Sequence, residues 1–451
     1  MKKILESLTL VATLLLFCPH AQAASVGNTD VSKTFFAGAF FDLPPGKDNQ
    51  MTKYLVRPAS GAAGELAGDE MTPYTEKLLA QEKPLLAKIH LALSATEPSE
   101  AAAMQGNPVA VYLSRAQHEI LTYSAPGTPN QYLTILSVAL TFDIFTDKAA
   151  MSQRRRLESI YSKLLVGEQS VITDSAMTAA QLGAAYKELY RKTLHELAGR
   201  VADDMDWSRD TADAVFQFTA FNFPSSGPPA EIRQLIESAI GSEGRALGED
   251  AKEWETQRFK LELLHTVNQF VSDELRRQGL SNIALMSPPS PWAQANVGEL
   301  LATRMGMGRM DSGQPMRLFV DSSLEETGQL RMKGKSQVLG YTISAGLAKA
   351  GTSMIAESKL GRSLQFSAGL AARITRPNPG GTPKLMPISI EDKSAKTPSA
   401  SGAKNFEVLA GVERPTTREI AMDAIRAGAK ALAPKIVALM KIIADDPVTN
   451  R

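Results

Sequence analysis

The chain has 451 residues, of which 43% are hydrophobic and 22% charged, and its formal net charge at pH 7 is +1. This is the composition of a globular protein long enough for two or three domains, and it excludes a disordered chain. The absence of a basic excess argues against a dedicated nucleic-acid-binding protein.

The first 23 residues have the pattern of a secretory signal peptide. Lys2 and Lys3 form a basic start, residues 8–17 are apolar, and Ala21-Gln22-Ala23 is a small-residue cleavage site. The apolar run is too short for a membrane span, which needs about 20 residues, and no later segment has such a run. We therefore predict a mature chain that begins at Ala24, has no transmembrane segment and is located in a bacterial periplasm.

The cysteine and charge counts of this mature chain exclude two further classes. Cys18 is the only cysteine, and it lies in the segment that is predicted to be removed, so we expect no disulfide and no cysteine metal site. Removing Lys2, Lys3 and Glu6 from the 49 basic and 48 acidic residues leaves 47 of each. The mature chain is neutral, which again does not suit nucleic acid.

The first predicted elements are short. Residues 33–43 form an aromatic-rich run that ends at a proline pair, which indicates a strand. A helix is predicted from Thr72, with a kink at Pro84, and short strands are predicted at 108–114 and 119–123.

The stretch from Tyr132 to Val201 has the clearest pattern of the chain. Apolar and polar residues alternate over 136–144, which predicts a half-buried strand. Residues 154–165 fit either a strand or a helix. Thr178 and Gln181 form a capping box, and the apolar stripe that follows predicts a helix with one face on a sheet.

The second half of the chain repeats this order. With an offset of 180 residues, Phe36 and Phe41 fall on Phe216 and Phe221. A long amphipathic helix is predicted at 249–277. Strands are then predicted at 316–320, 337–348, 353–360 and 363–375, and several adjacent strands of this kind favour an antiparallel meander.

The end of the chain contains a loop, a strand and a helix. Residues 377–404 are rich in Pro, Gly, Ser and Lys, which predicts a flexible exposed loop. A strand is predicted at 406–412. Thr416 and Glu419 form a second capping box, which opens the closing amphipathic helix.

These elements predict an α+β fold made of two tandem modules, each with helices packed on a mainly antiparallel sheet. The modules are expected at residues 24–205 and 206–451. One interpretation of the repeated order is an internal duplication.

The chain shows no motif for catalysis or for a cofactor, and we predict neither. His195-Glu196 lacks the second histidine of a zinc helix, because residue 199 is glycine. Weak candidates for a metal site, suited to calcium, are Asp203, Asp204, Asp206 and Asp210, and a solvated turn is the alternative interpretation.

The functional prediction is a periplasmic binding or assembly protein that acts through protein–protein contacts in the bacterial envelope. Its contact surfaces would be sheet edges, the proline-rich stretch 287–292 and the loop 377–404. The partner is expected to be an envelope protein. The alternative is an envelope hydrolase that uses carboxylates such as Asp143 as general acid or base.

Overall fold

The computed structural model describes the two sheets and the helices around them. The described residues are 34–41, 71–93, 107–123, 131–147, 156–205, 214–245, 249–288, 319–321, 329–332, 335–375, 397–409 and 418–445. The predicted signal peptide, Thr416 of the second capping box and residues 377–396 of the predicted loop lie outside them.

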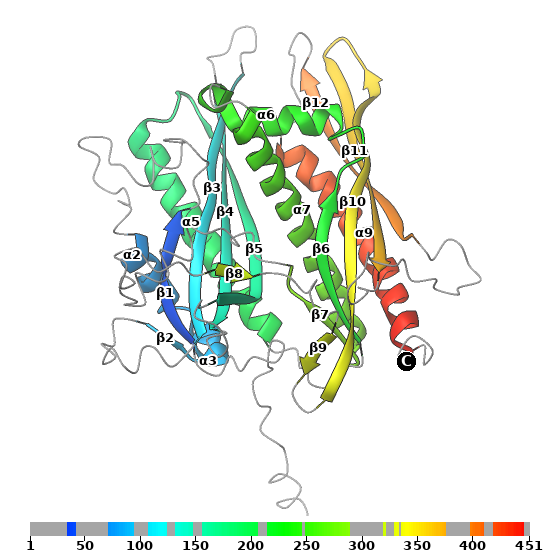
Figure 1. The fold of residues 1–451 in the computed structure, drawn as a ribbon. Coiled ribbons are helices and arrows are strands. Elements are labelled where there is room, and N and C mark those ends of the chain that lie inside the picture. The colour runs from blue at the N-terminus through cyan, green and yellow to red at the C-terminus, as the bar shows by residue number, and fades with distance from the viewer. Residues whose placement is uncertain are drawn as a thin grey trace, which may run out of the picture.

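The first sheet has the strand order β2-β1-β3-β4-β5-β8 (Figure 1). Its three long strands pair antiparallel, whereas β1 pairs parallel with β2 and β3, and β8 pairs parallel with β5. The strands are β1 (Thr34–Phe41), β2 (Leu91–Ala92), β3 (Asn107–Tyr123), β4 (Gln131–Asp147), β5 (Arg156–Thr173) and β8 (Phe319–Asp321).

The second sheet has the order β12-β11-β10-β6-β7, and β9 pairs with β10. Its long strands are again antiparallel, and β6 pairs parallel with β7 and β10. The strands are β6 (Ala214–Asn222), β7 (Ile283–Met286), β9 (Gln329–Met332), β10 (Lys335–Glu357), β11 (Gly361–Thr375) and β12 (Ser399–Leu409).

The two sheets therefore share the arrangement of five strands, and they differ in the sixth, because β8 pairs with the last strand of its meander and β9 with the first. In each, a short inner strand pairs parallel with an edge strand on one side and with the first strand of a three-stranded meander on the other. The α+β class and the two sheet modules are confirmed. Both sheets are mixed, because the short inner strands run parallel while the long strands of each meander run antiparallel.

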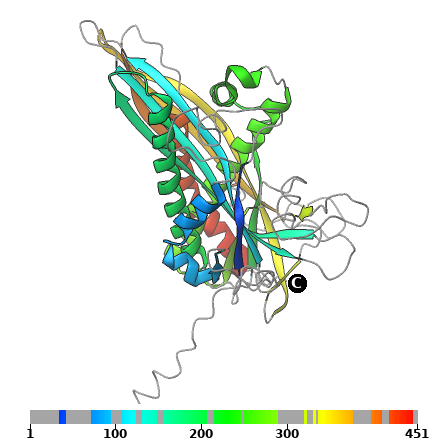
Figure 2. The ribbon, with the colours of Figure 1, turned by 90° about the vertical axis from the view of Figure 1, so that its left-hand side faces the viewer.

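The helices and sheets stack in four layers, as the views in Figure 1 and Figure 2 show together. A helix that closes each module, α5 or α9, covers one face of its sheet, and α7 packs beside α9. The first sheet lies between α5 and α7. The helices are α2 (Met71–Leu79), α3 (Lys83–Ile89), α5 (Ala179–Met205), α6 (Ala230–Arg245), α7 (Glu249–Gln278) and α9 (Arg418–Asp445).

Each module has its own apolar core between its sheet and its closing helix. The stripe predicted for the helix after Thr178 is buried in the first core, where Leu194 is 1% exposed. Leu432 of α9 is 0% exposed in the second core. Thr178 N donates to Gln181 Oε1 at 2.8 Å and Gln181 N donates to Thr178 Oγ1 at 3.3 Å, so the first capping box is confirmed.

The strand at 136–144 is correctly predicted, but it is not half-buried. Its apolar side chains face α5, while Ser137, Thr141 and Asp143 face the other way and are also buried. The reason is the tertiary arrangement, since α7 of the second module packs on the first sheet at β5 and forms ion pairs with Arg115 on this face. We call the face of each sheet that points away from its own closing helix the outer face.

Several boundaries differ from the predictions. The short strands at 108–114 and 119–123 are parts of β3, and the two strands at 337–360 are parts of β10, each with a register shift where a break was expected. The undecided stretch 154–165 begins β5, a strand. The predicted loop 377–404 ends early, because residues 399–404 pair with β11. The elements β2, α6, β7 and β9 were not predicted.

Candidate functional site

The first part of the site is a buried cluster of charges where the modules meet. A register shift in β3 places Arg115 on the outer face of the first sheet, opposite Ala139. Its guanidinium forms ion pairs with Glu255 and with Glu262, the latter at 2.8 Å, and both carboxylates come from α7. These three side chains are 3–5% exposed. Each buried charge therefore depends on the others for its stabilisation.

Two further arginines complete this cluster. Arg418, at the start of α9, forms a second ion pair with Glu262, and Arg258 donates to the carbonyl oxygen of Ser114. Burial, together with the nearby charge of Arg115, lowers the pKa of Arg418 to about 9. Burial also holds the pKa of Arg258 well below its usual value. The cluster thus joins β3, α7 and α9 through charged groups rather than through apolar packing.

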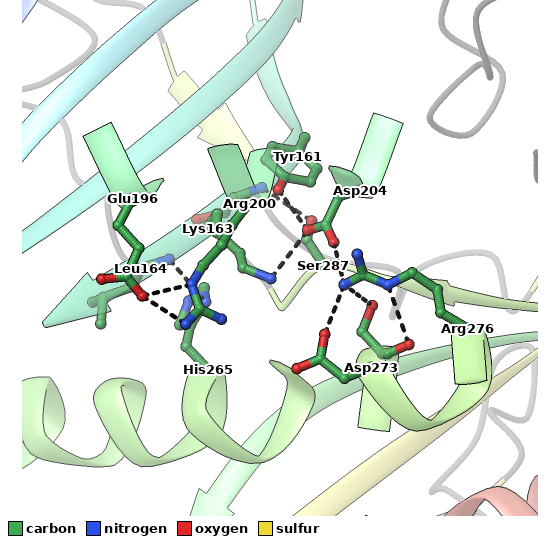
Figure 3. A network of polar contacts seen from close by, with 12 residues as sticks. Tyr161, Lys163, Leu164, Glu196, Arg200, Asp204, His265, Asp273, Arg276 and Ser287 are labelled. Atoms are coloured by element: carbon green, nitrogen blue, oxygen red, sulfur yellow. Dashed lines mark hydrogen bonds and ion pairs between the residues drawn. The ribbon is translucent and has the colours of Figure 1, made fainter. Parts of the chain in front are cut away.

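A second polar network lies near the end of α5 (Figure 3). Asp204 Oδ2 accepts from Tyr161 Oη at 2.7 Å and from Lys163 Nζ at 3.0 Å, and its Oδ1 accepts from Arg276 at 3.1 Å. Burial acts to raise the pKa of Asp204, but Lys163, the bond from Tyr161 and Arg276 outweigh it, so the pKa is lowered. Because Arg276 belongs to α7, this carboxylate also ties the modules together.

His265 of α7 occupies the space between these networks and is buried. Its Nδ1 accepts a hydrogen bond from Leu164 N of β5 at 3.3 Å. Burial, and to a smaller extent the charge of Lys163, lowers the pKa of His265 to about 3. The ring is therefore neutral at physiological pH, which agrees with its role as an acceptor.

The edge of β5 is the feature that these contacts leave partly open. Among the described strands, β5 pairs with β4 along most of its length but with β8 only through residues 156–158. Ser162 N donates to Ser287 Oγ at 3.0 Å, and Leu164 N donates to His265. Because backbone groups alternate along a strand, the next donors that point the same way are those of Val166 and Glu168.

These two residues line a cleft of about 390 Å³ between the modules. Charged side chains from both modules surround it, and several are paired: Arg200 contacts Glu196 at 2.7 Å, and Arg426 reaches Glu168 at 3.5 Å. The lining residues are Leu164, Leu165, Val166, Glu168, Glu196, Arg200, Glu262, Thr266, Gln269, Phe270, Glu419, Asp423 and Arg426. The volume lies in the range of clefts that bind small ligands or a short peptide stretch.

The predicted metal candidates are not brought together in the described part of the chain. Asp203 is exposed, Asp204 belongs to the buried network with Lys163, and Asp206 and Asp210 lie outside the described residues. No group of three or more metal-ligating side chains occurs among the residues that the structure describes. Asp203 and Asp204 point apart because they are adjacent on a helix.

Neither of the two other residues considered for chemistry lines the cleft. Asp143 is 0% exposed on β4, and it does not line the cleft. The exposed His195 lies at 2.8 Å from Glu82 of the loop before α3, which is an ordinary surface contact. Of the proline-rich stretch 287–292, Ser287 and Pro288 are described, and Ser287 contacts both modules through Ser162 and Gln217.

The residues that build the site were not found from the sequence, although one signal was present. Glu255, Arg258 and Glu262 recur at helical spacing on the side of α7 opposite its apolar stripe. Such a pattern is usually a solvated face. Here it is buried, which only the position of the first sheet explains.

Comparisons with known proteins add little. No protein-family model matches this chain, and no curated protein matches it. Among solved structures, the chain is similar to a minor lipoprotein from Acinetobacter baumannii at 12% sequence identity and a TM-score of 0.17, over 39% of this chain and 91% of that one. A similarity of this size carries no argument about function. None of the helices in the described ranges is long and apolar enough to cross a membrane.

Proposed function

We propose that this protein is a non-enzymatic binding or assembly protein of the bacterial envelope, and that it holds an extended segment of a partner protein along β5. The observation that carries the proposal is the open edge of β5 in the cleft between the modules. Backbone donors and acceptors on such an edge add a further strand readily, because they form the same ladder as within a sheet.

The surroundings of this edge favour a specific partner over general aggregation. The edge lies inside a cleft rather than on the outside of the sheet, so a flat strand of another molecule cannot approach along its full length. Glu168, Glu196 and Asp423 line the cleft together with Arg200 and Arg426. Paired charges at the rim of a binding cleft select a register, because a misplaced partner leaves them uncompensated.

Export to the periplasm is the second half of the proposal, and the residues before Ala24 support it. N-terminal sequencing of protein from a periplasmic fraction should begin at Ala24. Recovery of the intact chain from Met1 in the cytosol would contradict export while leaving the cleft proposal open.

The cleft proposal is tested by photo-crosslinking in cells. A photoreactive amino acid at position 168 should crosslink to an envelope protein, and the same amino acid at exposed position 192 of α5 should not. Val166→Pro removes the donor that points into the cleft and keeps the pairing with β4, so it should abolish the crosslink. Val166→Ala keeps the donor and is the matched control.

Two results would overturn the cleft proposal. One is an unchanged crosslink in Val166→Pro at wild-type stability, because strand addition needs that donor. The other is equal crosslinking from positions 168 and 192, because contact would then not be specific to the cleft.

A further inference from the structure

The free edge of β5 changes character at Val166. Before this residue the chain supplies its own partners, and β8 pairs with 156–158. Ser287 Oγ accepts from Ser162 N at 3.0 Å. His265 Nδ1 accepts from Leu164 N at 3.3 Å (Figure 3). From Val166 to the end of β5, no described strand pairs on this side.

Burial changes at the same point of the strand. Residues 161–165 are buried, residues 166–169 are half-buried, and Ser170 and Ile172 are exposed, the latter at 68%. The part of β5 that lacks a described partner strand is thus also the part that solvent can reach. Strand addition needs both features, because an incoming segment must bring its backbone groups beside free ones.

Four side chains along this open stretch share one face of the sheet. Val166 stands opposite Ala139 on the outer face, and Glu168, Ser170 and Ile172 follow on the same face at every second residue. The backbone donors and acceptors of these four residues point away from β4. Ile172 presents an apolar side chain at the far end of the stretch, about 20 Å from Val166 at about 3.3 Å per residue.

His265 closes the other end of the stretch. Its ring is 3% exposed, so an incoming strand can take Leu164 N only by displacing a buried side chain. A backbone carbonyl and a ring nitrogen cannot both accept this proton with good geometry. The ring therefore blocks pairing from Leu164 toward Ser162 and leaves residues 166–172 open.

We propose that the partner segment pairs with residues 166–172 of β5 in one register, that His265 sets where the segment ends, and that Ile172 receives one of its apolar side chains. This inference rests on the proposed function. The partner then offers an extended segment of about seven residues, because opposite residues of two paired strands advance together. An apolar residue of that segment lies at the end far from His265.

Photo-crosslinking from successive positions of β5 tests the register. A photoreactive amino acid is placed in turn at positions 168, 170 and 172 of the full-length chain in cells, and mass spectrometry identifies the crosslinked residue of the partner. Each step of two residues along β5 should move the crosslink by two residues along one segment of the partner. Partner sites that do not advance in this way overturn this inference while the proposed function stands. Absence of a crosslink from all three positions contradicts both.

His265→Ala tests the role of the ring. Without the ring the bound segment can shift by two residues, so the crosslink from position 168 should divide between two partner sites that are two residues apart. His265→Asn keeps an acceptor for Leu164 N and should give the single site of the wild type. A single site in His265→Ala, folded as judged by circular dichroism, overturns the role of His265.

Amide hydrogen exchange of the free mature chain locates the stop without any variant. The amides of Ser162 and Leu164 should exchange at least about tenfold more slowly than those of Glu168 and Ser170, because each of the first two donates to a buried or half-buried side chain. Equal protection of all four amides would show that the edge does not change at Val166, and it would overturn the proposal.

Ile172→Ser tests the apolar contact. It should lower the yield of the crosslink from position 168 by about tenfold, because the segment then buries less apolar area. Ile120→Ser makes the same change on β3, where the side chain is 39% exposed, and should leave the yield unchanged. Equal yields from the wild type and Ile172→Ser overturn the place of Ile172 in the proposal.

Discussion

The two sheets share the arrangement of an edge strand, a short inner strand and a three-stranded meander, but their surroundings differ. Around Arg115 and Ala139 the outer face of the first sheet is buried against α7, whereas the outer face of the second sheet carries exposed residues such as Lys349, Arg373 and Ser401. Both faces are polar. Polar residues on the second face of a strand therefore do not predict exposure: Arg115 is buried on such a face, and its charge is paired with Glu255 and Glu262 of the other module.

Arg115 and Lys349 make this comparison at single positions. Each follows a register shift in the first strand of its meander and lies on the outer face. Arg115 is buried between two glutamates, and Lys349 is exposed. We therefore expect the same substitution at these two positions to change the free energy of unfolding by different amounts.

Arg115→Ala should lower the free energy of unfolding by about 3–5 kcal/mol, because it leaves Glu255 and Glu262 buried with less positive charge. Lys349→Ala should change it by less than about 0.5 kcal/mol, as for most exposed sites. Urea unfolding of both variants measures the difference. Equal effects would show that the first sheet is not covered as described.

Leu194→Ala and Leu432→Ala test the feature that the modules share, which is the packing of a closing helix on its sheet. Each leucine is buried between a closing helix and its sheet, so each substitution should cost about 2–5 kcal/mol. Ile442→Ala on α9 is the control, since this residue is 45% exposed and should cost much less. A Leu432→Ala variant as stable as the wild type would end the claim that α9 closes the second module as α5 closes the first.

Gly167 and Gly402 distinguish the two helix–strand contacts. Each lies in the third strand of a meander, where the closing helix crosses. A Cβ at Gly402 would collide with backbone atoms of α9, while a Cβ at Gly167 would collide with the hydroxyl of Thr193. Each Gly→Ala variant should lose about 1–3 kcal/mol. Thr193→Ala should recover stability in the Gly167→Ala background, and truncating a side chain should not help Gly402→Ala, as thermal unfolding would reveal.

His265 should make the folding stability depend on pH. Its pKa is lowered from 6.5 to about 3, so the unfolded chain binds a proton that the folded chain does not, and stability falls as pH decreases below 6.5. Between about pH 6 and pH 5 the loss should be about 1.2 kcal/mol, because the imidazole of the unfolded chain is already mostly protonated at pH 6. His265→Asn keeps an acceptor for Leu164 N and should remove this part of the slope in urea unfolding. Asp204, whose pKa is lowered, adds its own loss only at more acidic pH, below its usual value of 3.8.

Much of the fold follows from local patterns. The alternation over 136–144 and the capping box at Thr178 each depend on residues close in sequence, and both elements were predicted correctly. The breaks placed inside β3 and β10 were wrong, because a register shift interrupts the alternation without ending the strand. Residues 399–404 were assigned to a loop because their side chains are small and mostly polar. In the structure such side chains suit close packing beside α9, and composition does not reveal this.

The candidate site was far less predictable. Arg115 and Glu262 are 147 residues apart, and the sequence carries no mark of their pairing. Asp204 looked like one member of a metal cluster, and its true partners come from β5 and α7. Pairings of this kind depend on how two modules pack, and each module alone is consistent with a solvated charged face.

Thiol labelling tests most directly whether the outer face of the first sheet is buried around Arg115 and Ala139 while the outer face of the second sheet is open around Lys349 and Ala371. Cys18 is the only cysteine and precedes Ala24, so a chain that begins at Ala24 offers one thiol for each cysteine introduced. Ala139→Cys and Ala371→Cys place that thiol on the two outer faces, and a cavity of about 20 Å³ beside Ala139 leaves room for sulfur. Because Ala139 is buried, the thiol of Ala139→Cys should react at least about a hundredfold more slowly than the thiol of Ala371→Cys, which corresponds to an opening cost of about 2.7 kcal/mol or more. Equal rates in two folded variants would contradict it.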